Sequence, residues 1–389
     1  MAADNYGLID FEYVAAGAAV LASGGGGSYR DALSVLAELT GWTGSVPVQA
    51  YDGQTDCGVL AMMGSPDAAT TLTLDNIQRS YINTLETFTT AVGAAPGCLI
   101  PVEVGPINSI VPLLAAASFG LWVVDGDGAG RAVPELPQTT YAGSATLAAA
   151  PCALANDADV DALVEDAIIE APTAARVETL AGGIVSAFGS FSGIALWPSN
   201  AGNGYALSGS YIAGTLSQAR ALGEYLLSAD TPPATAAVAT MITEITGRAA
   251  AASVVNFFIT SVTQSTTSAS LDAGVIRLDN APDPADSTAT CYLYNLNESL
   301  ILYSSASAAP LIVAPDSICY YSEITGLGFS NATNDLAVYY DFTAKQSTGI
   351  AVSVIAVAAA PQLCAATGVV DSFADLLREI GYAGVLPGA

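Results

Sequence analysis

The chain has 389 residues, of which 52% are hydrophobic and only 12% are charged. It carries 36 acidic and 9 basic residues, no histidine and one lysine, Lys345, so its formal net charge is -27. This charge excludes nucleic acids and anionic membrane surfaces as partners, because like charges repel. Without histidine, and with almost no lysine, catalysis must rest on carboxylates, cysteines, hydroxyls, arginines or backbone amides.

The apolar residues do not form a membrane span. Segments such as 14–22 and 349–360 are shorter than the roughly 20 residues that cross a bilayer. We therefore expect this apolar surface to be buried in cores or in subunit contacts. Cysteines stand at positions 57, 98, 152, 291, 319 and 364 without a CxxC pair, which argues against zinc. Their pattern leaves open buried free thiols or disulfides.

The first half of the chain alternates short apolar runs with amphipathic segments. Helical spacing, or acids at a helix start, predicts helices at residues 30–39, 75–92, 110–118, 157–169, 173–188 and 215–229. Short apolar runs predict buried strands at residues 59–63, 98–104 and 121–124. This alternation is typical of an α/β domain with a parallel or mixed sheet covered by helices.

The second half changes character after Pro232-Pro233. A predicted helix at residues 234–245 is followed by β-branched, alternating segments separated by turn-rich joints. The predicted strands are 253–262, 274–278, 289–294, 300–304, 311–313, 336–342 and 349–357, and a last helix covers 371–382. The sequence thus predicts an α/β N-terminal domain, residues 1–230, and a β-barrel-like or sandwich C-terminal domain, residues 231–389.

The segment Val-Val-Asp-Gly-Asp-Gly-Ala-Gly-Arg at residues 123–131 is the strongest candidate for chemistry. Asp125 and Asp127 have strand spacing, so both point to one face at the carboxyl end of a predicted strand, where α/β sheets bind ligands. With Glu103 they form a candidate set for a general base or for a divalent cation, and Arg131 would stabilise a developing anion. In the alternative interpretation, the aspartates form turns and Arg131 pairs with Glu135.

The run Gly24–Gly27 and the Asn108-Ser109 pair have two interpretations each. The glycines expose amides to an anion or allow close packing, and no nucleotide motif follows them. Asn108 binds a substrate amide or caps the following helix. A cysteine nucleophile lacks a neighbouring base that would lower its pKa.

Several stretches together resemble the S-methyl-thiohydantoin desulfurase-like family. They are AGAAVLASGGGG (16–27), VEVGPINSI (102–110), FGLWVVDGDGAGRAVPELPQTT (119–140), IAGTLSQARALGEYLLSA (212–229), YLYNLNESLIL (292–302) and LIVAPDSICYYSEITG (311–326). The resemblance spans nearly the whole chain. It implies activity on a hydantoin-like cyclic amide or thioamide, and it adds Gly25, Gly26, Asn108, Glu135, Asn297 and Glu298 as candidate substrate-binding residues.

The chain departs from the family pattern at three places. Ser28-Tyr29 replaces an Asp-Pro pair, Pro106 replaces the second glycine of Glu-x-Gly-Gly-x-Asn, and Phe257-Phe258-Ile259 replaces a lysine-containing segment. These changes remove a carboxylate, a backbone N–H and a cation.

Two functions follow from these observations. The first is a divergent, non-catalytic homologue that associates with itself as a structural subunit of a homopolymer or filament. The chain has few charged residues and one lysine, and obligate interfaces are likewise depleted in Lys and Glu. The second is a hydrolase or desulfurase that acts on a hydantoin-like ring in a cleft between the domains. The composition favours an extracellular location, whereas an active family enzyme would be cytoplasmic.

Overall fold

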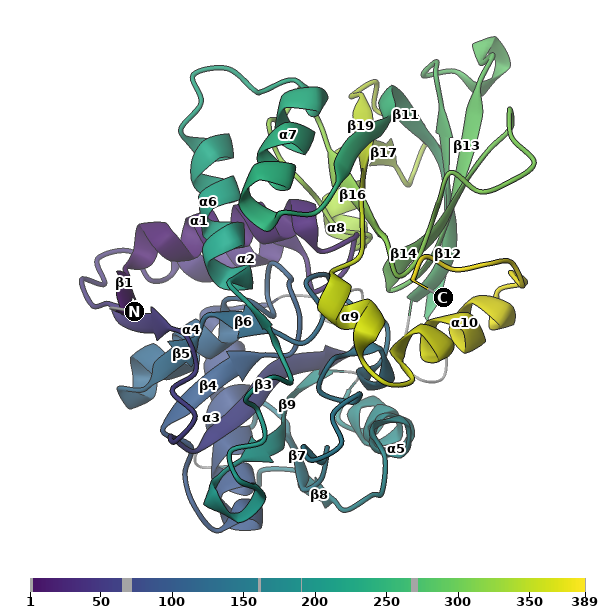
Figure 1. Ribbon diagram of the computed structural model, residues 1–389. Coiled ribbons are helices and arrows are strands. Elements are labelled where there is room, and N and C mark those ends of the chain that lie inside the picture. The colour runs from purple at the N-terminus through teal and green to yellow at the C-terminus, as the bar shows by residue number, and fades with distance from the viewer. Residues whose placement is uncertain (1–2, 65–71, 160–161, 190, 267–271, 389) are drawn as a thin grey trace.

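The computed structural model describes residues 3–64, 72–159, 162–189, 191–266 and 272–388. It has a mixed α/β N-terminal part and a C-terminal part made mostly of antiparallel sheet that nearly closes into a barrel (Figure 1). This confirms the predicted fold class. In the residues that the structure describes, no helix combines the length and the apolar character that a membrane crossing needs.

Eight strands of the described residues form the N-terminal sheet, in the order β1-β2-β5-β4-β3-β9-β7-β8. Strands β2, β5, β4 and β3 run parallel, and the other pairs are antiparallel. The bounds are β1 Asp4–Tyr6, β2 Val46–Gln49, β3 Cys57–Gly64, β4 Cys98–Pro101, β5 Trp122–Val124, β7 Cys152–Ala155, β8 Asp166–Ile169 and β9 Phe191–Ser199. A two-stranded sheet pairs β6 (Gly126–Asp127) with β10 (Ile212–Ala213).

Helices cover both faces of this sheet. Successive residues of β3 enter different cores, with Leu60 on one face and Val59 on the other. The Leu60 face packs against α3 (Leu74–Val92) and α4 (Val111–Phe119), and the Val59 face packs against α5 (Ala174–Ala187). The amphipathic pattern of α3 explains its position, because Ile77, Tyr81, Leu85 and Phe88 repeat at helical spacing and are buried.

Helices α1 (Leu8–Leu21) and α6 (Thr215–Leu227) touch backbone to backbone. A Cβ atom on Gly17 would lie 1.8 Å from the carbonyl oxygen of Ala219, and one on Gly223 would lie 1.8 Å from that of Tyr13. Only glycine allows this approach, so these two positions set the distance between the helices. The helix α2 (Tyr29–Ala37) follows the Gly24–Gly27 run, and α7 (Thr235–Thr246) leads into the C-terminal sheet.

Within the described ranges, seven antiparallel strands form the C-terminal sheet, in the order β15-β14-β13-β12-β11-β19-β16. Buried side chains such as Ile276, Leu293 and Val354 fill its interior. The bounds are β11 Ala250–Thr266, β12 Asp272–Asp279, β13 Thr290–Leu296, β14 Glu298–Ser304, β15 Ile312–Val313, β16 Ser317–Tyr321 and β19 Val352–Val357, with a small pair of β17 Tyr340–Asp341 and β18 Gln346–Ser347. Short helices α8 (Thr333–Leu336), α9 (Pro361–Ala365) and α10 (Val369–Glu379) complete the chain.

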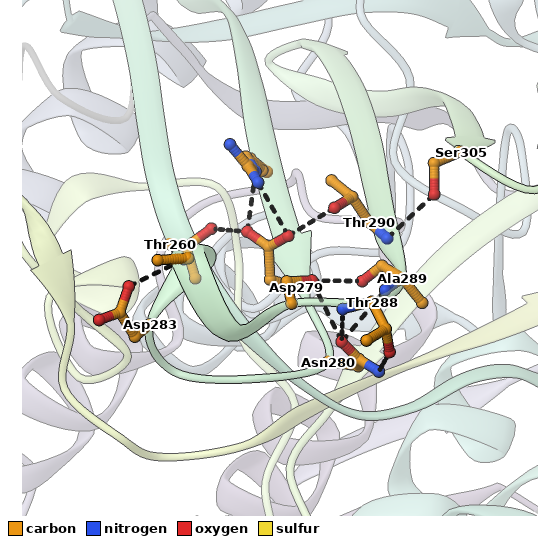
Figure 2. Close-up of polar contacts among 11 residues, drawn as sticks. Thr260, Asp279, Asn280, Asp283, Thr288, Ala289, Thr290 and Ser305 are labelled. Atoms are coloured by element: carbon orange, nitrogen blue, oxygen red, sulfur yellow. Dashed lines mark hydrogen bonds and ion pairs between the residues drawn. The ribbon is translucent and has the colours of Figure 1, made fainter.

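A polar network closes the connection between β12 and β13 (Figure 2). The buried carboxylate of Asp279 accepts hydrogen bonds from the hydroxyls of Thr260 and Thr290 and pairs with Arg277. The side-chain oxygen of Asn280 accepts from backbone and hydroxyl donors at residues 287–289. All these contacts are internal, so we assign this network to stability rather than to ligand binding.

Most predicted elements are confirmed, and two are wrong. Residues 157–169 do not form a helix where they are described: β8 pairs with β7 in the sheet, and the acid at its start, Asp166, accepts a hydrogen bond from Thr87. Residues 336–342 are the end of α8 and the short strand β17, because the chain turns around the buried carboxylate of Asp335. The division at residue 230 stays a prediction.

Candidate active site

The aspartates of the Asp-Gly-Asp-Gly segment contact the protein itself. Asp125 follows β5 and accepts hydrogen bonds from the backbone N–H (3.0 Å) and the hydroxyl (2.7 Å) of Ser217, so its negative charge lies at the N-terminal end of α6. Asp127 is 1% exposed and accepts from the backbone N–H groups of Ala129 and Gly130. Asp127 therefore forms the local turn that the alternative interpretation predicts, whereas Asp125 does not, because its oxygens accept from Ser217, which is distant in the sequence. Gly126 and Gly128 do not have positive φ, although Gly130 does.

Arg131 is fully buried and connects the two halves of the chain. Its guanidinium donates to the carbonyl oxygens of Ala132, Ser299, Pro315 and Asp316, at 2.8 to 3.1 Å. It also stacks over the ring of Phe373, 5.6 Å from the ring centre. The ion pair with Glu135 that we considered is absent from the described residues, because the backbone carbonyls occupy these donors.

A cavity of about 120 Å³ lies beside this region and receives side chains from both halves of the chain. Among the predicted site residues it brings together Glu103, Glu135, Asn108, Asn297, Glu298 and Gly26. Its apolar wall includes Met62, Val102, Ile107, Leu136, Val185 and Ile194. Asp125, Asp127, Arg131 and Gly25 do not line it.

Glu103, two residues after β4, is 5% exposed and held at both oxygens. One oxygen accepts from the Asn108 amide at 2.8 Å, and the other accepts from the Val133 backbone N–H at 2.7 Å. Burial nevertheless raises its pKa to about 7, and the negative charge of Asp127 adds to this. Its hydrogen bonds and the charge of Arg131 act in the opposite direction. A carboxyl group with this pKa exchanges protons near neutral pH.

Asn108 fixes the orientation of Glu103. While its amide nitrogen donates to Glu103, its oxygen accepts from the backbone N–H of Met62 at 3.0 Å. It does not cap the next helix, since Ile110 is the N-cap residue of α4 and has no side-chain cap.

Glu298 begins β14 and is 3% exposed. Its Oε2 atom has no hydrogen-bond partner among the described residues. Burial raises the pKa of Glu298 well above its ordinary value, and the charge of Glu103 raises it further. Burial therefore favours the protonated form of Glu298 relative to that of an exposed glutamate.

The glycine run makes room for Glu298. A Cβ on Gly25 would lie 1.9 Å from Oε1 of Glu298, and one on Gly26 would lie 2.3 Å from the Cα of Gly105. The run therefore packs closely against two other segments. Asn297 forms the one-residue turn between β13 and β14 with φ +53, and its side-chain oxygen accepts from the backbone N–H of Asp272 at 2.7 Å. These contacts direct Glu298 to the cavity.

Two further glutamates line the cavity. Burial raises the pKa of Glu135 and raises that of Glu178 to about 7. Glu178, which was not among the predicted site residues, lies on α5 and accepts from the backbone N–H of Leu136 at 2.9 Å. Its one available signal was its place beside Val177 on the apolar face of that helix.

A cation does not fit Asp125 and Asp127, because N–H and O–H donors already occupy the oxygens of Asp125 and Oδ1 of Asp127. Across the described ranges, no group of three His, Cys, Asp or Glu side chains is arranged to hold a metal ion. The six cysteines are free thiols. Burial raises the pKa of Cys98 far above its ordinary value, so it is not a thiolate nucleophile at neutral pH.

Comparison with known proteins supports the predicted resemblance. Residues 9–166 match the N-terminal domain and residues 172–370 match the C-terminal domain of the family described as S-Me-THD-like. A crystal structure of a protein from Chromobacterium violaceum matches with a TM-score of 0.78 and 28% identity, over 98% of this chain and 99% of that one. No curated protein matches the chain. Because the two domain models cover most of the chain in order, it belongs to the S-Me-THD-like family.

Proposed function

We propose that this chain hydrolyses a small hydantoin-like cyclic amide or thioamide, with Glu103 as the general base and Glu298 as the general acid. The observation that carries this proposal is a pair of cavity-lining carboxyl groups with different environments. Glu103 accepts a hydrogen bond at each oxygen, whereas Glu298 has an unpartnered oxygen, and burial raises the pKa of Glu298 well above its ordinary value. Such a difference assigns the two roles at one pH.

In the proposed reaction, the Glu103 carboxylate takes a proton from water, and the water oxygen forms a bond to the ring carbon. The bond from that carbon to the leaving nitrogen or sulfur then breaks, and Glu298 gives its proton to the leaving atom. The apolar wall around Ile107 and Met62 accommodates the ring and excludes bulk water. Arg131 contributes positive charge near both glutamates without lining the cavity.

The test is an assay for turnover of hydantoins and their S-methyl-thio analogues. Turnover is measured as the loss of the ring's absorbance. We expect Glu103→Gln and Glu298→Gln to lower kcat/KM by about 100-fold or more, the usual size of an acid–base contribution. Asp125→Asn is the matched control, since it changes an aspartate outside the cavity, and it should keep most of the activity. Turnover that survives in both glutamate variants would exclude this site.

A second candidate is self-association into a homopolymer without catalysis, as the composition indicates. Its structural support is a set of strongly exposed apolar side chains on different segments: Leu163 is 90% exposed, Val385 84% and Ile324 63%. A filament needs two different surfaces that meet head to tail, and separated apolar positions are compatible with that requirement. Electron microscopy and light scattering of the purified protein test it, and a monodisperse monomer at high concentration would refute it.

A further inference from the structure

The cavity has an excess of acidic side chains that ring hydrolysis does not require. Carboxyl groups reach it from Asp31 on α2, Glu103 after β4, Glu135, Glu178 on α5 and Glu298 on β14. No lysine or arginine of the described residues lines it. Five acids from five separate segments therefore surround a space whose remaining wall is mostly apolar.

Glu298 is the cavity carboxyl group that lacks a hydrogen-bond donor at one oxygen among the described residues. The side chain is 97% buried, lines the cavity and leaves Oε2 without a hydrogen-bond donor. A buried polar atom without a hydrogen bond destabilises the folded protein. A ligand that offers an N–H group at this position would remove that cost.

The buried arginines nearby do not supply this donor. Arg131 donates to four backbone carbonyl oxygens. Arg248 donates to the carbonyl oxygens of Gly130 and Ala358 and to the Ser317 hydroxyl. Neither forms an ion pair with a carboxylate in the described residues. The N–H donor for Oε2 of Glu298 is therefore neither of these two arginines, although the charge of Arg131 acts on Glu298 from a distance.

We propose that the ligand of this cavity carries a compact N–H cation, such as an ammonium or guanidinium group, which donates to Glu298. This inference deepens the proposed function by naming the substrate class, and it rests on the same cavity. A volume of about 120 Å³ holds roughly eight to twelve water-sized groups, which fits a five-membered ring with a short cationic arm. The apolar residues Ile107 and Val185 favour such a ring body.

The expected preference for a cationic ligand over an anionic one arises from electrostatic interactions inside the buried cavity. A cation beside several carboxyl groups is attracted strongly, because the effective dielectric constant there is far below that of water. An anionic arm meets like charges and also loses its hydration. Binding of a cation should also release protons, since burial raises the pKa of Glu298 and that of Glu103, and a nearby positive charge lowers both.

The experiment is calorimetric titration of the full-length protein at pH 7 and 0.15 M salt with four probes. Three share the ring: 5-(3-aminopropyl)hydantoin, 5-butylhydantoin and 5-(2-carboxyethyl)hydantoin. The fourth, butylammonium, lacks the ring. We expect the aminopropyl probe to bind at least tenfold more tightly than the butyl probe and the carboxyethyl probe to bind most weakly. Heats in two buffers of different ionisation enthalpy should show proton release only with the cations.

The variants locate the preference. Glu298→Gln should bring the aminopropyl and butyl probes within about threefold, whereas the exposed control Glu86→Gln should leave their ratio unchanged. If Glu298→Gln does not fold, Glu178→Gln replaces it and should at least halve the ratio. Equal or tighter binding of the butyl probe to the wild-type protein overturns the inference. Binding of cations without turnover of any ring supports the inference and rejects hydrolysis, and turnover without cation preference does the reverse.

Discussion

Replacing Glu103 with glutamine should make the stability of the protein less dependent on pH. The folded chain raises the pKa of Glu103 from 4.5 to about 7, because the carboxylate is buried. Between these values the folded state holds a proton that the unfolded state releases. The stabilising contribution is complete below pH 4.5 and is lost as the pH rises through 7.

The size of the effect follows from the two pKa values. Integrating the difference in bound protons from pH 5 to pH 8 gives a loss of about 2–3 kcal/mol in the free energy of unfolding for this one group. Glutamine does not titrate, so the variant should lack this part of the decline. Glu103→Gln also disturbs a hydrogen bond to Asn108 or Val133, and that cost is the same at both pH values.

Urea unfolding at pH 5 and pH 8, at constant ionic strength, measures the difference. Glu86→Gln removes one carboxylate from the exposed surface of α3 and controls for the change in net charge. We expect the decline between the two pH values to be about 2–3 kcal/mol smaller in Glu103→Gln than in wild type or Glu86→Gln. Equal declines in all three proteins would show that Glu103 does not titrate in this range and would remove it as a base.

Three further substitutions test the packing of the site by urea unfolding. Gly25→Ala places a Cβ 1.9 Å from Oε1 of Glu298, so it should lower the free energy of unfolding by about 2 kcal/mol or more and weaken ligand binding at least tenfold. Gly183→Ala on α5 is the control. Its new Cβ meets open space, so it should be neutral or stabilising. In Asp335, Oδ1 accepts from the Ser28 hydroxyl and the Arg30 backbone N–H, and Oδ2 accepts from the backbone N–H groups of Tyr29 and Ser330. Asp335→Asn leaves a single acceptor oxygen for these donors, and about 3 kcal/mol of destabilisation is expected. Arg131→Met leaves four buried carbonyl oxygens without this donor, and a loss of about 3–5 kcal/mol should appear; a loss below 1 kcal/mol would contradict its role as a connector.

Periodicity was sufficient to predict most helices and many strands. The apolar spacing of α3 and the single acid in the first turn of α10, Asp371, are local signals that the tertiary structure reinforces. Strands β9 and β16 were not predicted, because a strand that is buried on both faces has no alternation to reveal it. The helix predicted at residues 157–169 is wrong because acids near a chain turn resemble the start of a helix.

The site was harder to predict, since a sequence does not show where a carboxylate finds its donors. Asp127 accepts hydrogen bonds from the backbone N–H groups of Ala129 and Gly130, two and three residues away, and the positive φ of Gly130 permits that turn. Glu103 and Glu298 are 195 positions apart, and only the packing of the two domains places both on one cavity. The Asp-Gly-Asp-Gly segment therefore makes internal contacts, and the chemistry that we propose uses isolated glutamates beside it.

The energetic cost of those glutamates separates the two candidate functions. A subunit that only self-assembles gains nothing from a buried carboxyl oxygen without a donor, and an apolar side chain at Glu298 would stabilise it. A binding site gains from the same atom, because the attraction to a cation offsets the cost of burying the charge when the ligand arrives. Without ligand, the protein should therefore be less stable at neutral pH than a variant with an apolar side chain at Glu298. Binding of the ligand should raise the stability of the wild-type protein. A filament subunit with an unused cavity would have no such dependence on a small cation.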